Sequence, residues 1–322
     1  MISLYHKILV PLDGSALAEQ VLSHLQRLAA PAETTLVLVN VLEPMPYTMT
    51  TLHYVPPDFF TYPRSNAEAY IVEQQKQLQA LGFRVETHIV EGDVAANIVR
   101  VATATNVDLI AMTTHGRSGF VRWALGSVAE RVVCETPLPV FLVRETTALS
   151  GDKFHRILVP LDGSPLAEQA LPQAVALAQA TGAELLLLQV IQTLDAENER
   201  ILFKNEAEAQ AAVAQWQTSA ETYLQQVAQP IQAQGVVCVC RAVAGNVVET
   251  IIATAETAGI DLLVISTHGR SGLQRWFYGS VTNKVLRGVS CPLLVIHNPP
   301  TPMDLPQLDK AKLVLSTTSV VT

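Results

Sequence analysis

HKILVPLDGS, at residues 6–15, and HRILVPLDGS, at residues 155–164, are one segment written twice in the same chain. A second segment, THGRSG at residues 114–119, returns at residues 267–272, followed in both places by Arg-Trp and then by Gly-Ser-Val. The two segments repeat at offsets of 149 and 153 residues. Repeats this long exceed any solenoid unit, so each copy should be a complete domain with its own core.

The duplication divides the chain into two domains with a short connection. We expect a first domain over residues 1–145, a linker over 146–153, a second domain over 154–297 and a C-terminal tail over 298–322. The linker is polar and rich in turn-forming residues. The tail is rich in proline and has no counterpart at the end of the first copy, so we expect it to be loosely ordered.

Within each copy, short apolar runs alternate with segments of helical periodicity. The first copy predicts strands at residues 8–12, 34–42, 85–90, 107–113 and 140–143, and helices at 15–28, 66–81, 93–105 and from 126 onward. The second copy predicts strands near Ile157, Leu185, Val236, Leu262 and Leu293. This alternation indicates an α/β fold of two tandem doubly wound domains, each with a five-stranded parallel sheet flanked by helices.

Composition excludes several classes of protein. Of the 322 residues, 49% are hydrophobic and 16% are charged, which is typical of a globular protein with well-filled cores. A net charge of -8 argues against partners such as nucleic acid or an anionic membrane. The chain has no apolar run long enough to span a bilayer, no signal-like N-terminus, and four cysteines without metal or disulfide spacing, so we expect it to be cytoplasmic.

Both repeated segments fall at carboxyl ends of predicted strands, where open parallel sheets bind their ligands. Asp13 and Asp162 directly follow the first strand of each copy. A carboxylate at this place can accept hydrogen bonds from the hydroxyls of a sugar or hold a cation. It can equally well cap the turn or the helix behind it, and the aspartates alone favour that structural role.

The second segment has the outline of a phosphate cradle. Gly126-Ser127 opens a predicted helix, where unpaired backbone N–H groups and the positive end of the helix dipole favour an anion. Ser127 and its counterpart Ser280 can add a hydroxyl donor, and the loop arginines Arg117 and Arg270 can add a charge. The recurrence of this arrangement in both halves strengthens the interpretation.

Together, the Pro-Leu-Asp-Gly-Ser turn, the Thr-His-Gly-Arg-Ser-Gly loop and the Gly-Ser pair beyond it resemble the universal stress protein family over nearly the whole of both halves. The resemblance implies an adenine-nucleotide α-hydrolase-like fold, with ATP or AMP, together with Mg²⁺, as the ligand. Members that bind nucleotide carry the signature Gly-x2-Gly-x9-Gly-Ser/Thr. In this chain Thr113 and Ser266 stand where the signature has its first glycine, and their side chains either crowd a ligand or add a hydrogen bond.

The same resemblance implies roles for individual residues. Asp13 and Asp162 would approach the ribose, and the main chain of Val41 and Val190 would line the adenine pocket. The candidate ligand-binding residues in the two copies are Pro11, Asp13, Ser15, Val41, Thr113, Gly116, Arg117, Gly126, Ser127, Val128, Pro160, Asp162, Ser164, Val190, Ser266, Gly269, Arg270, Gly279, Ser280 and Val281.

The expected function is regulatory binding of adenine nucleotide in a stress response. The alternative is a stress-response scaffold that binds other proteins and has vestigial nucleotide sites. Catalysis is expected to be at most weak ATP hydrolysis: Ser118, His115 and Asp13 supply the residue types of a triad, but the chain lacks G-x-S-x-G and has no P-loop.

The last predicted strand of each domain is followed at once by linker or tail, which is typical of an edge strand with unpaired backbone groups. The resemblance implies dimerisation through this strand. In a tandem chain the two edges can meet within one molecule, so we expect an intramolecular pseudo-dimer, with a homodimer as a further option.

Overall fold

The computed structural model describes residues 4–43, 61–114, 125–144, 151–193, 203, 205–267 and 280–297, with the backbone alone at 61–63 and 280. In the first half the elements are β1 (Lys7–Pro11), α1 (Ala16–Glu19), η1 (Gln20–His24), α2 (Leu25–Leu28), η2 (Pro31–Glu33), β2 (Thr35–Leu42), α3 (Thr61–Ala80), β3 (Arg84–Glu91), α4 (Val94–Ala104), β4 (Leu109–Thr113), α5 (Ser127–Glu135) and β5 (Val140–Val143). In the second half they are β6 (Arg156–Pro160), α6 (Pro165–Glu168), α7 (Leu171–Thr181), β7 (Glu184–Gln192), α9 (Glu206–Gln232), β8 (Cys238–Gly245), α10 (Val247–Thr257), β9 (Leu262–Thr267), α11 (Ser280–Gly288) and β10 (Leu293–His297).

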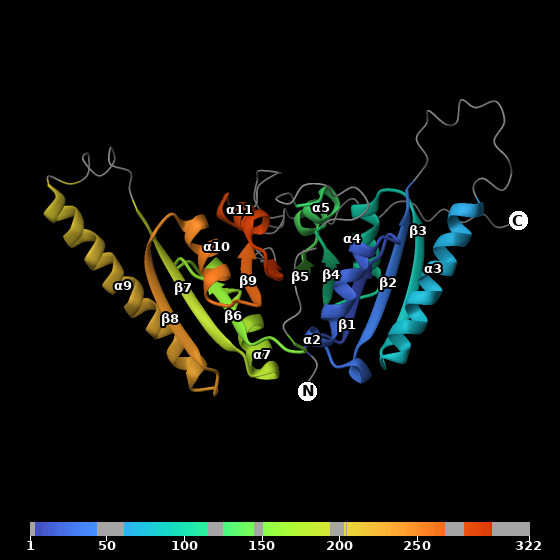
Figure 1. The fold of residues 1–322 in the computed structure, drawn as a ribbon, viewed down its shortest axis with the longest axis horizontal. Helices are drawn as coiled ribbons and strands as arrows, with labels where there is room; N and C mark the ends of the chain where they lie inside the picture. The colour runs from blue at the N-terminus through green and yellow to red at the C-terminus, as the bar shows by residue number, and fades with distance from the viewer. Residues whose placement is uncertain are drawn as a thin grey trace, which may run out of the picture.

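The strands form one ten-stranded sheet in the order β3-β2-β1-β4-β5-β10-β9-β6-β7-β8 (Figure 1). Within each half all neighbouring strands are parallel, which confirms the predicted α/β fold. At the centre, β5 and β10 pair antiparallel, with Phe141 opposite Leu294. The two parallel sets are therefore joined edge to edge into a single mixed sheet.

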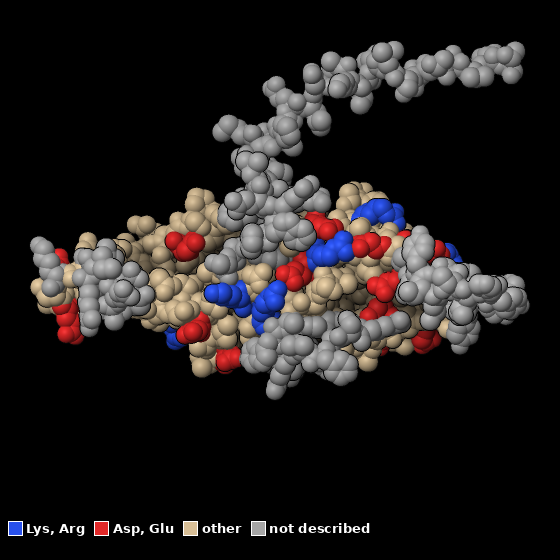
Figure 2. All heavy atoms as spheres, turned by 90° about the horizontal axis from the view of Figure 1, so that it is seen from above, with Lys and Arg blue, Asp and Glu red and all other residues tan. Residues whose placement is uncertain are grey.

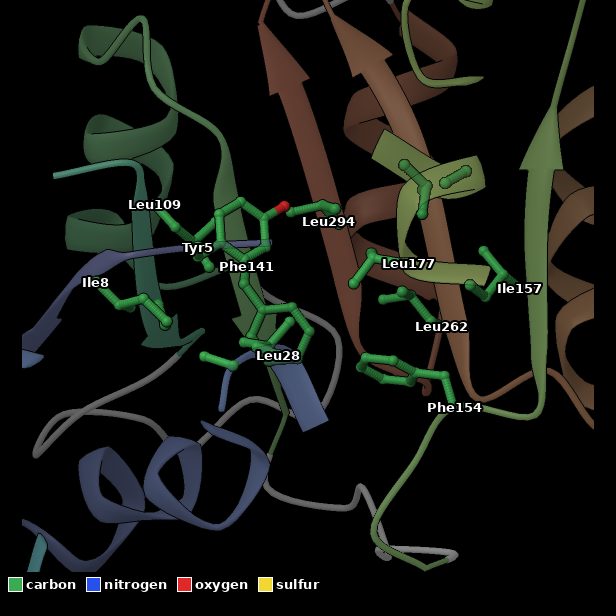
Figure 3. Close-up of a cluster of buried hydrophobic side chains, with 14 of the residues drawn as sticks. Tyr5, Ile8, Leu28, Leu109, Phe141, Phe154, Ile157, Leu177, Leu262 and Leu294 are labelled. Atoms are coloured by element: carbon green, nitrogen blue, oxygen red, sulfur yellow. The ribbon is translucent and has the colours of Figure 1, made fainter. Parts of the chain in front are cut away.

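Helices cover both faces of this sheet because its strands are apolar on both sides. One face packs against α1, α2, α3, α7 and α9, and the other against α4, α5, α10 and α11 (Figure 1). Each of the two hydrophobic clusters contains residues of both halves. Figure 3 shows Tyr5 and Phe141 of the first half beside Leu294 and Phe154 of the second. The halves thus share two cores, whereas the repeat length predicts a separate core for each.

The first helix departs from its predicted form. The helical periodicity over residues 15–28 predicts one continuous helix, but the structure has α1, the 3₁₀ turn η1 and α2 in succession. Ser23 Oγ donates to the Gln20 carbonyl oxygen at 2.7 Å inside the 3₁₀ turn. No proline or glycine marks the break, so the apolar pattern reveals the buried face but not the change of helix type.

The side of the sheet that carries α5 and α11 is seen from above in Figure 2. Acidic and basic side chains of the described residues are interspersed on this surface. Among the helices that the structure describes, none combines the length and apolar character needed to cross a bilayer.

Candidate functional site

The candidate site of the first half lies where β1 and β4 end side by side. β1 pairs with β2 on one edge and with β4 on the other, so the strand order reverses at this point. Pro11 ends β1, Asp13 follows it, and Thr113 ends β4. The second half repeats the arrangement around β6, which lies between β7 and β9. The geometry brings the aspartate turn of each half beside the strand end that leads into the second repeated segment, Thr113 in the first half and Thr267 in the second.

The turn after β1 holds Asp13 in a fixed orientation. Ser15 donates to Asp13 Oδ1 from its backbone N–H at 2.9 Å and from its hydroxyl at 2.6 Å. The same hydroxyl oxygen accepts from the Ala18 N–H at 3.1 Å and so caps α1. Gly14 has a φ of 82°, a conformation that favours glycine. Asp13 is half-buried, so part of its carboxylate serves the turn, as the structural alternative anticipates.

The turn after β6 is nearly a copy of the first. Ser164 N–H donates to Asp162 Oδ1 at 2.9 Å, and Ser164 Oγ accepts from Ala167 N–H at 3.1 Å. Gly163 also has a φ of 82°. Asp162 is more exposed than Asp13. Both aspartates therefore lie at a carboxyl edge of the sheet, held by the serine two residues on.

The start of α5 lies directly beside the end of β4. Thr114 N–H donates to the Val143 carbonyl at 2.9 Å, and Gly126 N–H donates to the Thr114 carbonyl at 2.8 Å. Thr114 and Gly126, which precede and follow residues 115–125 in the chain, therefore bond to each other. Among the described residues no side chain caps α5 at Gly126, whereas Asp93 caps α4 in the same half. The first-turn amides of α5 consequently keep donors for an anion.

Other candidate residues surround these two features. Ser127 is exposed and Val128 half-buried in the first turn of α5, and Val281 is half-buried in the first turn of α11. The half-buried Val41 and Val190 lie near the ends of β2 and β7, each one strand away from the aspartate turn.

The residues at the place of the first signature glycine are enclosed. Thr113 is 8% exposed and Ser266 is 7% exposed. The structure does not describe five of the predicted site residues, which are Gly116, Arg117, Gly269, Arg270 and Gly279. The side chain of Ser280 also lies outside the described part of the chain.

Asn40 is a site residue that the motifs did not reveal. It is buried in β2, and its Nδ2 donates to the Leu12 carbonyl at 2.7 Å, so it ties the aspartate turn to the neighbouring strand. The sequence signal that could have revealed Asn40 is that it is the single amide side chain in an otherwise apolar or β-branched strand. The equivalent residue in β7 is Gln189, whose Oε1 is buried without a hydrogen-bond partner in the described chain, as is Thr267 Oγ1 at the end of β9. Within the described residues, the second site therefore has two buried side-chain oxygens that accept no hydrogen bond.

Metal-ligating side chains do not gather at either site within the described ranges. No group of three His, Cys, Asp or Glu residues there is placed to hold a metal ion.

Comparison with known proteins gives a consistent answer for both halves. A family model described as the universal stress protein family matches residues 4–144 and, separately, residues 153–297. Each half of the chain is therefore similar to this family along nearly its full length.

Individual relatives agree. A universal stress protein of Mycobacterium tuberculosis H37Rv is 28% identical over 202 residues, which cover 61% of this chain and 63% of that protein, so the match spans less than two thirds of the relative. A universal stress protein of Synechocystis is 31% identical over 153 residues, 45% of this chain and 99% of the relative. The crystal structure of a universal stress protein from Archaeoglobus fulgidus shares the fold, with a TM-score of 0.65 and 21% identity over 91% of this chain and 96% of that one.

Proposed function

Because the chain belongs to the universal stress protein family, we propose that it binds an adenine nucleotide, ATP or AMP, as a regulatory ligand at the carboxyl ends of β1 and β4 and of β6 and β9. The observation that carries the proposal is the start of α5. Within the described residues no side chain caps its first turn, and Gly126 at its start bonds to Thr114, directly after β4 at the reversal of strand order. A phosphate group is the ligand that such a helix start fits best.

The other candidate residues would each contact a different part of the nucleotide. Phosphate would lie against the amides of Gly126, Ser127 and Val128. Asp13, oriented by its serine, would accept hydrogen bonds from the ribose hydroxyls, and the main chain of Val41 would bound the base. In the second half the corresponding positions are Gly279 to Val281, Asp162 and Val190, and Pro11 and Pro160 bring the chain into each turn. Bound Mg²⁺ would neutralise phosphate charge; the chain itself supplies orientation and donors.

Isothermal titration of nucleotide-stripped protein tests the proposal directly. We expect ATP or AMP to bind with at most two sites per chain. Adenine nucleotide is also expected in the supernatant when freshly purified protein is denatured. Absence of heat at millimolar ligand, together with absence of released nucleotide, would overturn the proposal.

Conversion of Asp13 and Asp162 to asparagine tests the assigned site. Asparagine keeps an oxygen for the serine N–H but loses the charge, so we expect affinity to fall on the order of tenfold while the turn persists. Glu73→Gln, on the exposed face of α3, removes a similar charge far from the site and should leave binding unchanged. Equal affinity in the double variant and the control would contradict the ribose role. The single variants Asp13→Asn and Asp162→Asn, measured separately, show which half of the chain binds the nucleotide.

A second candidate function is a scaffold that binds other proteins and has vestigial sites. The observation in its favour is the enclosed side chain of Thr113, and of Ser266, where nucleotide-binding members have glycine. Replacing both residues by glycine should raise nucleotide affinity if these side chains crowd the ligand. Unchanged affinity in that variant would remove crowding as the argument for a scaffold.

We also propose that the β5 and β10 pair is the intramolecular counterpart of a family dimer. The antiparallel pairing and the shared hydrophobic clusters support this proposal. Residues 1–145 and 154–297, expressed separately and mixed, are expected to associate. Two strictly monomeric halves in sedimentation would count against the proposal.

A further inference from the structure

β5 and β10 relate the two halves by an approximate two-fold axis. Phe141 lies opposite Leu294, its own equivalent at the offset of 153 residues, so the axis passes between these two residues. We call the contacts that cross this strand pair the seam. Because the halves are copies, every seam contact can be compared with the one its equivalents make on the other side of the axis.

Two seam contacts are reciprocal. Arg144, the residue after β5, donates from Nη2 to the Leu286 carbonyl in the last turn of α11. Its equivalent His297, the last residue of β10, has its Nε2 2.8 Å from the carbonyl oxygen of Val133, the equivalent of Leu286, in α5. Each central strand thus ends on the helix of the opposite half. These contacts are available whichever two halves meet.

The contact of Arg27 is made from one side only. Its Nη2 lies 3.1 Å from Asp261 Oδ2 and 2.7 Å from the Lys153 carbonyl, and its guanidinium lies 4.2 Å from the ring centroid of Phe154. The Arg27 side chain is 2% exposed and that of Asp261 is 11% exposed. The residue equivalent to Arg27 in the second half is Ala176. The second half therefore supplies the carboxylate of this buried ion pair and has no arginine or lysine at the place of Arg27; its own side-chain contact to Asp261 Oδ2 is the exposed imidazole of His155, at 3.3 Å from Nδ1.

Two further seam contacts are made by residues whose equivalents on the other side of the axis lack the required polar group. Tyr5 Oη donates to Gln173 Oε1 at 2.9 Å, and the residue equivalent to Tyr5 is Phe154, which has no hydroxyl. On the other face of the sheet, Arg287 Nη2 lies 3.0 Å from Glu130 Oε1, and the residue equivalent to Glu130 is Asn283. The first half therefore supplies the hydroxyl of one contact and the carboxylate of the other.

We propose that the seam surface of the second half selects a first half of this chain as its partner and rejects a second copy of itself. A pair of second halves would place Ala176 against Asp261 and Phe154 against Gln173, on both sides of the axis. It would lack the Arg27–Asp261 ion pair and the Tyr5–Gln173 hydrogen bond on both sides of the axis, and would leave Asp261 with the contacts of its own half, as Asp108 is left in this chain. A pair of first halves keeps Arg27 opposite Asp108, the equivalent of Asp261, so it is penalised less. The inference rests on the seam and not on nucleotide binding.

A swap of the cation in the uncut chain tests the two-fold relation. Arg27→Ala should lower the urea midpoint, and adding Ala176→Arg should recover at least half of the loss, because the axis places the new guanidinium beside Asp108. The recovery should vanish when Asp108 is also changed to asparagine. A double variant no more stable than Arg27→Ala would overturn the proposal.

A cut chain tests partner choice. A protease site within residues 145–150 allows the folded protein to be cut once, and native mass spectrometry counts the pairs after mixing in mild urea and its removal. Pairs of two second halves are expected on the order of tenfold or more below random pairing. Such pairs at the random level would overturn the proposal. In the cut Arg27→Ala/Ala176→Arg protein, pairs of two second halves should become more frequent. If the cut halves do not exchange partners, the urea midpoints of the uncut variants decide the question.

Discussion

Replacement of Asp261 by alanine is expected to lower the free energy of unfolding by about 3–5 kcal/mol. The substitution leaves the Arg27 guanidinium, buried at the seam, without its carboxylate. Burial lowers the pKa of Arg27, and the negative charge of Asp261 opposes that shift. The aspartate therefore stabilises the charged form of the buried guanidinium. Asp261 also accepts the backbone N–H of His155 at 2.8 Å and of Arg156 at 3.1 Å. Urea unfolding at neutral pH measures the loss.

The first half provides the matched control. Asp108 accepts the N–H of His6 at 2.8 Å and of Lys7 at 2.9 Å, as its equivalent does in the second half, but Arg27 does not bind it. Asp108→Ala should therefore cost only about 1–2 kcal/mol, the value of the lost backbone acceptor. Equal losses in the two alanine variants would show that the ion pair contributes nothing beyond the backbone contacts.

Acidification is expected to destabilise the protein through His24. This residue is 1% exposed, and its Nδ1 has no hydrogen-bond partner in the described chain. Burial, and after it the charge of Arg27, lowers the pKa of His24 to about 4. In the unfolded chain the pKa is about 6.5, so between these values the unfolded state binds the proton that the native state excludes. The contribution of His24 is complete above about pH 6.5 and declines toward pH 4, by about 3 kcal/mol in all.

His24→Gln isolates this contribution, because glutamine is the residue at the equivalent position, Gln173. Urea midpoints of the wild type and the variant, measured between about pH 7 and pH 4.5, should converge as the pH falls. Some slope should persist in the variant, because burial also lowers the pKa of His297. Parallel curves for the two proteins would contradict the role of His24.

The fold could be predicted from the sequence because its strands are buried on both faces. Such strands are continuous apolar runs, as in Leu36–Val39, and their recurrence in the second half removed the ambiguity of any single run. The helix after β1 was predicted less well. Its apolar spacing suits an α-helix and a 3₁₀ turn alike over four or five residues, and only the packing of η1 against β4 and β5 distinguishes them.

The contacts of the site can be predicted from nearby residues in the sequence more often than the contacts of the seam. Asp13 and Ser15 are two residues apart, so their hydrogen bonds follow from turn chemistry alone. Asn40 reaches Leu12 across a strand pair, and Arg27 reaches Asp261 across 234 positions in the chain. The first contact depends on how β1 and β2 pair, and the second depends on how strands β5 and β10 meet, which neither repeat encodes by itself. The sequence therefore predicts where a ligand would lie better than it predicts what joins the halves.

The antiparallel pair at the centre of the sheet also bears on how the chain can change by mutation. In a dimer of identical subunits each mutation at the two-fold axis occurs twice, so a new cation arrives together with its own like-charged copy. After duplication and fusion the same mutation occurs once, and its neighbour across the axis is free to change separately. Arg27 faces Asp261, whereas Ala176 leaves Asp108 to its backbone partners, and a dimer of two identical subunits could not carry this difference.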